Sequence, residues 1–526
     1  MLVAVTAMLG SGWLFGPLYA AKMAGPSSIL AWLLGGALIF VMALPFAELG
    51  SMFPITGGLV RFVQFSHGPL VALAMGLAAW YAAAIVSPIE TLALIEYAAN
   101  YIPGLMHEVG GTPVLTGEGM LAAVGLLAVL AVFNTLSART VSKTNYFIVA
   151  IKIVIPLTTV AALILTAFHP HNFSVAMSDV HSTNLKNMLY AIPNAGIVFS
   201  FLGFTAAIQL AGESKNPKRV IFWALLSSMI ICAVLYTLIQ IAFIGAVNPV
   251  HLTHGWQHLS YAGDSGPFAG IAAGIGLVWL VYVLYADAFI SPLGVAVVYT
   301  ASAARINYAL SKNGLMPKFM QKLNRKGVPA VAILANFIFG ALVFLPFPGW
   351  QSMVAFLVSG FVFTYGVGPL ALMVLRKKLP EHPRPFRLPF ANVLTLISFY
   401  IGNLILFWTG WNTVSKLLIF LTAGLAALGI YKLVKKNGAL QSVNAKAGLW
   451  LIPYLIGLAI VSYFGTFGGG KGVIPFGIDF LVIFLFSVCI YYLAYHCAFL
   501  KGTIDTTQFI PKQILADESE LSHSNP

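Results

Sequence analysis

Among the ionisable residues inside long apolar stretches of this sequence, where a charge needs a reason, three are the main candidates for chemistry. Lys152 stands in Val-Ala-Ile-Lys-Ile, Glu90 follows Val-Ser-Pro-Ile, and Asp287 lies between two alanines. A charge inside a bilayer is costly, and residues that are retained there commonly carry protons or ions. A buried lysine can exchange its proton near physiological pH, so the sequence predicts Lys152 as a proton carrier, with Asp287 and Glu90 as candidate partners.

Each of these residues also has a structural interpretation. Lys152 follows Lys143 by only nine residues, so its ammonium could instead extend to the cytoplasmic surface. Asp287 and Glu90 could join a proton relay, contact a substrate ammonium, or brace helices as neutral acids. The sequence favours function for Lys152 and Asp287 and leaves Glu90 open.

Glycine-containing interruptions form a second group of candidates. Residues 9–13 are Leu-Gly-Ser-Gly-Trp and residues 200–204 are Ser-Phe-Leu-Gly-Phe, and both segments lie within apolar stretches. Glycine lowers the cost of leaving helical geometry, and backbone groups freed at membrane depth need a partner. A bound solute can be that partner, whereas close helix packing through small residues is the structural alternative.

The elements that position these residues must be membrane helices. Of the 526 residues, 59% are hydrophobic and only 8% are charged, which is too little charge to cover a soluble protein of this size. Apolar runs of about 20 residues, the length that crosses a bilayer, recur along the chain. We predict about fourteen spans, at residues 2–22, 28–50, 69–99, 118–137, 145–168, 187–212, 219–246, 268–303, 329–346, 352–375, 393–411, 414–434, 448–467 and 476–499.

The net charge of +13 is distributed as orientation in a bilayer requires. With the N-terminus in the cytoplasm, basic residues gather in every second loop, and only Lys22, Lys186, Lys416 and Lys471 face outside. The charge therefore indicates membrane orientation and excludes nucleic acid as a partner. The interrupted spans, the first and the sixth, begin two successive groups of five helices, a pattern typical of inverted-repeat transporters with a midplane site.

Four segments resemble motifs of the amino acid–polyamine–organocation transporters. They are Gly-Ser-Gly-Trp-Leu-Phe-Gly at 10–16, Glu-Leu-Gly-Ser-Met-Phe-Pro at 48–54, Phe-Leu-Gly-Phe at 201–204 with Gly-Glu-Ser-Lys-Asn-Pro-Lys-Arg at 212–219, and residues 305–314 after the eighth span. Within that superfamily the chain is most similar to bacterial aspartate–proton symporters, because of Trp13, residues 286–292 and two extra C-terminal spans. Many relatives carry glutamate where this chain has Thr205, so a role of that carboxylate does not carry over.

The resemblance implies an all-α polytopic membrane protein with a 5+5 inverted-repeat (LeuT-like) core and discontinuous helices 1 and 6. It implies a multi-pass location in the bacterial cytoplasmic (inner) membrane, with both termini cytoplasmic. The predicted parts are a ten-helix transport core at 1–375 (repeats 1–168 and 187–375), helices 11 and 12 at 393–434, an extra pair at 448–499 and a cytoplasmic tail at 500–526.

An amino acid substrate would present a carboxylate and an ammonium to the two helix breaks. The N-terminus of a half-helix suits the carboxylate, to which Ser11 adds a hydroxyl donor, and unwound carbonyls near Leu202 suit the ammonium. Phe204 and Thr205 could contact the substrate side chain. The predicted substrate-binding residues are Gly10, Ser11, Gly12, Phe201, Leu202, Gly203, Phe204 and Thr205, and the predicted proton-coupling residues are Lys152, Asp287 and Glu90.

The predicted function is secondary active transport, as proton-coupled symport of L-aspartate or L-glutamate by alternating access. The resemblance disfavours sodium, because some proton-coupled relatives place a fifth-helix lysine where sodium-coupled ones hold an ion. A neutral or cationic amino acid or polyamine permease, an exchanger, and a nutrient receptor remain alternatives. The expected partners are the substrate and the lipid bilayer, with no obligate protein partner.

An enzyme is not expected, because the sequence contains neither a His-Glu-x-x-His motif nor a phosphate-binding loop ending in Lys-Ser or Lys-Thr. No cofactor is expected besides the coupling proton. His251, His254 and His258 form a loop cluster, but no cysteine or well-placed carboxylate completes a zinc site there. We interpret them as solvated loop residues.

Overall fold

The computed structural model describes residues 2–52, 58–109, 112–136, 145–175, 184–204, 217–259, 266–347, 349–434 and 445–498. Helices dominate these ranges, as expected for a chain whose backbone polar groups must be satisfied within a bilayer. The α-helices are α1 (Leu2–Met8), α2 (Ser11–Ala24), α3 (Ser28–Met52), α4 (Gly58–Ala98), α5 (Gly117–Leu136), α7 (Asn145–Ala167), α8 (Asn184–Asn194), α9 (Ile197–Phe201), α11 (Pro217–Ala246), α12 (Pro267–Gly274), α13 (Val278–Lys312), α14 (Ala330–Val343), α15 (Trp350–Lys378), α16 (Ala391–Thr409), α17 (Trp411–Val434), α18 (Leu451–Phe464) and α19 (Ile478–Cys497).

Short 3-10 helices and one hairpin complete the described elements. Strands β1 (Met106–Val109) and β2 (Thr112–Leu115) pair antiparallel between α4 and α5. The 3-10 helices are η1 (Gly25–Ser27), η2 (Pro170–Ser174), η3 (Leu202–Phe204), η5 (Pro249–Leu252), η6 (Trp256–His258), η7 (Lys318–Gln321) and η9 (Ala445–Gly448).

The length and apolar character of the helices fit a multi-pass membrane protein. Within the described ranges, ten helices are long and apolar enough to cross a membrane, or eleven if the bent pair at 185–204 counts as one span. Each of the fourteen predicted ranges contains helix, but α14 and α18 have only 14 residues each. The number of spans and the inverted repeat therefore stay predictions.

Two helices run further than the hydrophobic pattern predicted. Helix α4 begins at Gly58, ahead of the predicted start at 69, and continues through a kink at Gly68 (φ 79°, ψ −179°). The predicted eighth span is divided into α12 and α13, and α13 extends to Lys312. The segment expected after that span is therefore still helical, and it ends where Gly314 adopts φ 72° and Leu315 N–H donates to Leu310 O at 2.9 Å.

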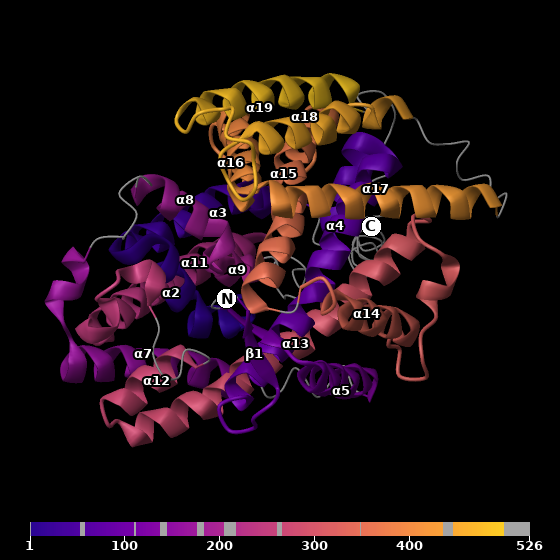
Figure 1. Cartoon of the computed structure of the whole chain (residues 1–526). Helices are drawn as coiled ribbons and strands as arrows, with labels where there is room; N and C mark the ends of the chain where they lie inside the picture. Colours follow the sequence, from indigo (N-terminus) through magenta and orange to yellow (C-terminus); the bar gives the residue numbers. More distant parts are fainter. Residues whose placement is uncertain are drawn as a thin grey trace, which may run out of the picture.

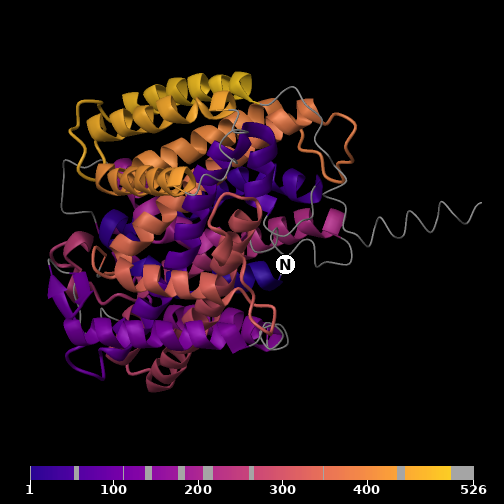
Figure 2. The same cartoon turned by 90° about the vertical axis from the view of Figure 1, so that its right-hand side faces the viewer.

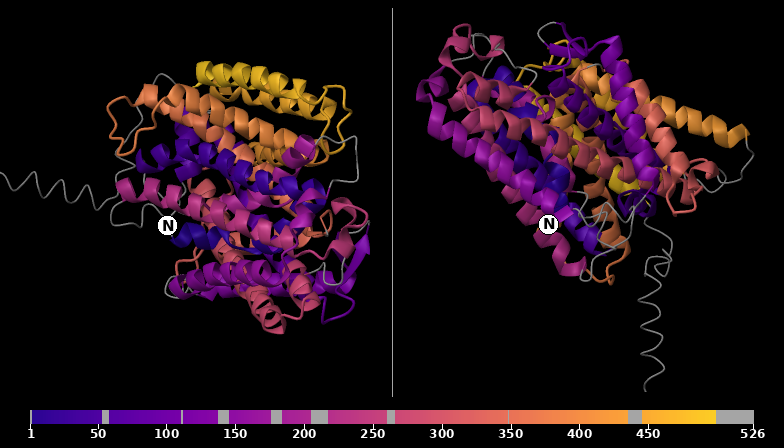
Figure 3. Two further views of the ribbon diagram at one scale, coloured as in Figure 1. Left: turned by 90° about the vertical axis from the view of Figure 1, so that its left-hand side faces the viewer. Right: turned by 90° about the horizontal axis from the view of Figure 1, so that it is seen from below.

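The helices form a bundle in which α4 packs along both α13 and α15. In Figure 1 the C-terminal pair α18 and α19 lies at one edge, beside α16, while α5, α7 and α12 lie at the opposite edge. Figure 2 and the left panel of Figure 3 show the same separation from two other sides. The pair that follows α17 thus packs outside the part of the bundle that contains α1, α2 and α9.

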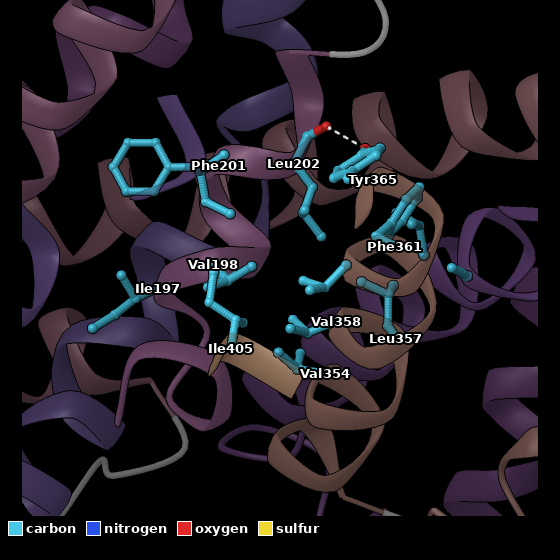
Figure 4. Packing of buried hydrophobic residues seen from close by; sticks show 14 of the residues in the cluster. Ile197, Val198, Phe201, Leu202, Val354, Leu357, Val358, Phe361, Tyr365 and Ile405 are labelled. Carbon is cyan, nitrogen blue, oxygen red and sulfur yellow. Dashed lines mark hydrogen bonds between the residues drawn. The ribbon is translucent and has the colours of Figure 1, made fainter. Parts of the chain in front are cut away.

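Helix α9 and the turn η3 are held in place by apolar packing against α15 (Figure 4). Tyr365 of α15 also donates its hydroxyl to the carbonyl of Leu202 at 3.4 Å. Inside a bilayer such close van der Waals packing, more than burial from water, fixes one helix against another. The residues labelled in Figure 4 are Ile197, Val198, Phe201 and Leu202 of α9 and η3, Val354, Leu357, Val358, Phe361 and Tyr365 of α15, and Ile405 of α16, which lies beside Val198.

Candidate functional site

The first span is broken at Leu9 and Gly10, between α1 and α2, and the ammonium of Lys152 lies against this break. Lys152 Nζ donates to the carbonyls of Leu9 at 2.8 Å, Thr6 at 3.1 Å and Ser291 at 3.0 Å. Three donors meet three acceptors, so the ammonium is saturated although the side chain is 0% exposed. The structure thus places Lys152 at the break and not at the cytoplasmic surface, against the snorkelling alternative.

The carboxylate of Glu90, from α4, caps the N-terminus of α2. Glu90 Oε2 accepts the backbone N–H of Ser11 at 2.9 Å, and Oε1 has no hydrogen-bond partner among the described residues. A Cβ on Gly10 would lie 2.5 Å from Oε1, so glycine allows this approach. Unpaired N–H groups and the helix dipole favour an anion here. Glu90 therefore occupies the position where we predicted the substrate carboxylate.

Asp287 of α13 completes the cluster from the other side. Its Oδ1 accepts the hydroxyl of Ser291 at 2.7 Å, and its Oδ2 accepts the indole N–H of Trp13 at 3.2 Å. Asp287 and Glu90 are both close enough to Lys152 for electrostatic interaction. One cation with two carboxylates has a net charge of −1, which is costly inside a membrane. A proton on one carboxylate would neutralise the cluster.

The sixth span is also broken, but its bend lies earlier than predicted. We expected the interruption at 200–204, whereas α8 and the segment 197–204 meet at an angle of 52° around Ala195 and Gly196. Gly196 adopts φ 87°, a conformation that other residues rarely take, and the ring of Trp350 fills the space where its side chain would be. Residues 202–204 do leave α-helical geometry, as the 3-10 turn η3.

The two broken spans touch through glycine. A Cβ on Gly203 would lie 2.5 Å from the carbonyl carbon of Ala7, and one on Gly12 would overlap the hydroxyl of Ser200. The predicted residues Phe201, Leu202, Gly203 and Phe204 thus lie beside α1, and all four are buried. Thr205 and Glu213 lie outside the described residues.

Two aromatic residues that the sequence did not single out also contact the breaks. Tyr236 of α11 donates its hydroxyl to the carbonyls of Met8 at 2.9 Å and Ser200 at 3.3 Å. Trp350, at the start of α15, donates its indole N–H to the hydroxyl of Ser11 at 3.0 Å. Because tyrosine and tryptophan also pack in ordinary membrane helices, their positions in the sequence gave no signal.

Trp350 separates Ser11 from a cavity of about 280 Å³. The indole stacks on the ring of Tyr19, with centroids 5.5 Å apart and planes 8° apart. Tyr19, Trp350, Tyr190 and Lys416 line the cavity together with the β2 residues Thr112, Pro113 and Val114. In the predicted orientation this is the outer side of the membrane, so the cavity is suited to be an entrance to the cluster at Ser11.

A family model described as amino acid permease matches residues 1–428. The chain belongs to the amino acid permease family. The permease is 37% identical to the glutamate/serine transporter AimA of Bacillus subtilis (strain 168) over 99% of its own length and 97% of that protein. It is 33% identical to the aspartate-proton symporter of the same organism over 96% of both chains. The branched-chain amino acid permease BcaP of that organism is 23% identical, over 82% of the permease and 91% of BcaP.

These matches and the apolar helices confirm several predictions from the sequence. The permease is a multi-pass integral membrane protein of an amino acid transporter family and not an enzyme. The resemblance to the amino acid–polyamine–organocation superfamily is confirmed as well. The domain boundaries, the orientation of the termini and the roles of the individual site residues stay predictions.

The permease contains a second buried charge cluster, at the end of α3. Glu48 accepts from Arg376 Nε at 2.9 Å and Nη2 at 2.5 Å, and from the backbone N–H of Leu388 at 2.7 Å. Arg384 Nε lies 3.4 Å from Oε1 of Glu48. Glu48 is fully buried, whereas the side chain of Arg376 is 20% exposed. This cluster joins α3 to α15 and to the loop before α16, and we interpret it as structural.

Proposed function

We propose that this permease transports acidic amino acids together with protons by alternating access. The observation that supports the proposal most is that the ammonium of Lys152 donates hydrogen bonds to the backbone carbonyls of Thr6, Leu9 and Ser291. A protonated lysine holds the break of the first span against α7 and α13. Loss of that proton removes the charge that the carbonyls solvate, and the three elements are then free to separate.

Glu90 provides a link between the proton and the substrate. Its carboxylate accepts the N–H of Ser11, the same group that would bind the carboxylate of an amino acid at the N-terminus of α2. Protonation of Glu90 makes it a weaker acceptor than the substrate carboxylate. Proton binding at Glu90 therefore favours substrate binding at Ser11, which is the coupling that symport requires.

The choice of an acidic substrate is supported by two relatives. One is named an aspartate-proton symporter and another a glutamate/serine transporter. The second name makes serine the next candidate for this permease, and Lys416 at the rim of the outer cavity offers a cation to an anionic substrate. No organic cofactor or metal takes part in the mechanism, since the proton is the coupling ion.

Alternating access would move the two broken spans against the helices that hold Lys152 and Asp287. The contacts of α1 with η3 and of Gly12 with Ser200 join the broken spans into one unit. Trp350 closes the outer side by its hydrogen bond to Ser11. Opening toward the outer cavity therefore requires this bond to break, and the binding of substrate at Ser11 competes with it.

The test is uptake of labelled L-aspartate into proteoliposomes containing the purified permease, with and without an inward proton gradient. We expect accumulation that a protonophore abolishes and that excess L-glutamate inhibits. L-serine, L-leucine and L-lysine as competitors separate acidic from neutral and cationic specificity. Accumulation that is unaffected by the protonophore would contradict proton coupling. Absence of aspartate transport by folded protein, with transport of serine, would replace the acidic substrate with a neutral one.

A further inference from the structure

A second cavity, of about 430 Å³, lies at the ends of α4 and α13 and is lined by three cationic residues. Arg61 comes from the start of α4, and Arg305 and Lys312 come from the last turns of α13. In the predicted orientation this end faces the cytoplasm. The other lining residues are Tyr308, Ala309, Leu323, Gly327 and Pro329, so none of the described lining residues is acidic.

Among the residues that the structure describes, none provides a counter-charge to the positive charges of this cavity. Arg61 and Arg305 make no hydrogen bond or ion pair with any residue that the structure describes, and Lys312 contacts only the ring of Tyr308, at 5.5 Å from its centroid. Three unpaired cations around one hollow repel one another, and an anion placed between them removes that cost. The arrangement thus differs from Arg376, whose charge is paired with Glu48.

Membrane orientation explains only part of this pattern. Cytoplasmic loops carry an excess of lysine and arginine in most membrane proteins, and Lys318, Lys322 and Arg325 are exposed examples in this chain. Orientation does not require that cations from two separate helices converge on one cavity. The cavity also has an aromatic and apolar part, formed by Tyr308, Leu323 and Pro329.

We propose that this cavity binds a phosphate group, presented either by an anionic lipid headgroup or by a soluble phosphate ester. Two guanidinium groups and one ammonium are the donors that recognise phosphate, since a guanidinium can form two parallel hydrogen bonds to its oxygens. Basic pockets between helices on the cytoplasmic side of membrane proteins commonly take such headgroups. The volume exceeds that of phosphate alone and leaves room for a glycerol or sugar moiety against Tyr308 and Leu323.

A bound phosphate would connect α4, α13 and the loop before α14. A ligand that binds the folded state and not the unfolded state raises thermal stability. The unfolding temperature therefore reports occupancy of the cavity without any transport assay. The site lies apart from the cluster around Lys152, and its test does not depend on the identity of the transported amino acid.

The experiment titrates the purified, detergent-solubilised permease with dioctanoyl phosphatidylglycerol, and separately with glycerol 3-phosphate, while following thermal unfolding. Dioctanoyl phosphatidylcholine controls for the acyl chains. The test variant is Arg305→Gln/Lys312→Gln and the matched control is Lys318→Gln/Arg325→Gln. Both variants remove one arginine and one lysine, all four residues are exposed, and the control residues do not line the cavity.

We expect saturable stabilisation of the wild type, with an apparent Kd that rises about 25-fold in the test variant, or about fivefold for each cation removed. The control variant should stay within about twofold of wild type, and added salt should weaken binding. Stabilisation by phosphatidylglycerol alone identifies a lipid headgroup, and stabilisation by glycerol 3-phosphate as well identifies a soluble ester. No stabilisation by either, or an equal loss in both variants, would overturn the proposal.

Discussion

Substitution of Lys152 separates a structural role of its ammonium from a role as proton carrier. Lys152→Met removes the donor from three buried carbonyls. The carbonyl of Ser291 lies inside α13 and keeps its helical donor, so the carbonyls of Thr6 and Leu9 are the ones left unsatisfied. At about 1–3 kcal/mol for each, the loss reaches about 2–6 kcal/mol if neither water nor an ion replaces the ammonium. Lys152→Arg keeps a cation that can donate to the same carbonyls but does not lose its proton in a protein.

The assay compares proton-driven accumulation with substrate counterflow in proteoliposomes. We expect Lys152→Arg to fold and to retain counterflow. Its proton-driven accumulation should be at least about tenfold lower than that of the wild type. Lys152→Met should lose accumulation and unfold at a lower temperature, because the carbonyls of Thr6 and Leu9 then lack a donor. Full proton-driven accumulation by folded Lys152→Arg would refute the assignment of Lys152 as the proton carrier. It would leave the ammonium as a fixed structural cation.

Three further substitutions test the remaining contacts. Glu90→Gln keeps an oxygen to accept the α2 N–H but cannot gain or lose a proton, so aspartate uptake, measured by initial rates, should lose most of its dependence on external pH. Glu48→Gln leaves the guanidinium of Arg376 without its counter-charge. The free energy of unfolding should fall by about 3 kcal/mol, the lower end for a broken buried ion pair, because Arg376 is partly exposed. Thermal unfolding measures the loss, and an unchanged unfolding temperature would contradict it. Gly203→Ala forces a Cβ against the backbone of α1 and should cost about 1–3 kcal/mol, whereas Gly125→Ala, where a Cβ meets nothing within 4 Å, serves as the control in the same measurement.

The sequence predicted apolar helices and singled out the three ionisable residues that the structure brings together, because the bilayer makes both features conspicuous. An apolar run must be long enough to cross the membrane, and a lysine such as Lys152 is unusual inside one. The partners of that lysine could not be predicted. Its acceptors are backbone carbonyls, which every residue possesses, and one of them belongs to Ser291, 139 residues away.

The differences from prediction also have physical reasons. The bend of the sixth span follows from the backbone conformation of Gly196, but a glycine at 203 gave the same signal in the sequence. Trp350 and Tyr236 each contact a helix break through one polar atom on an otherwise apolar ring. A hydropathy pattern therefore does not distinguish them from other packing residues. The pairing of Glu48 with Arg376 joins residues 328 positions apart, a distance over which a single sequence carries no information about contact.

The contacts of Lys152 also bear on how the chain is made. Membrane helices are inserted in the order of synthesis, and a lysine at the centre of one costs about 2.5–3.5 kcal/mol on insertion scales. Two of its acceptors, Thr6 and Leu9, and the neighbouring carboxylate of Glu90 precede it in the chain. When α7 leaves the ribosome, these partners are already in the membrane, whereas Ser291 and Asp287 do not yet exist. The growing chain can therefore accommodate its buried cation before the second half of the protein has been translated.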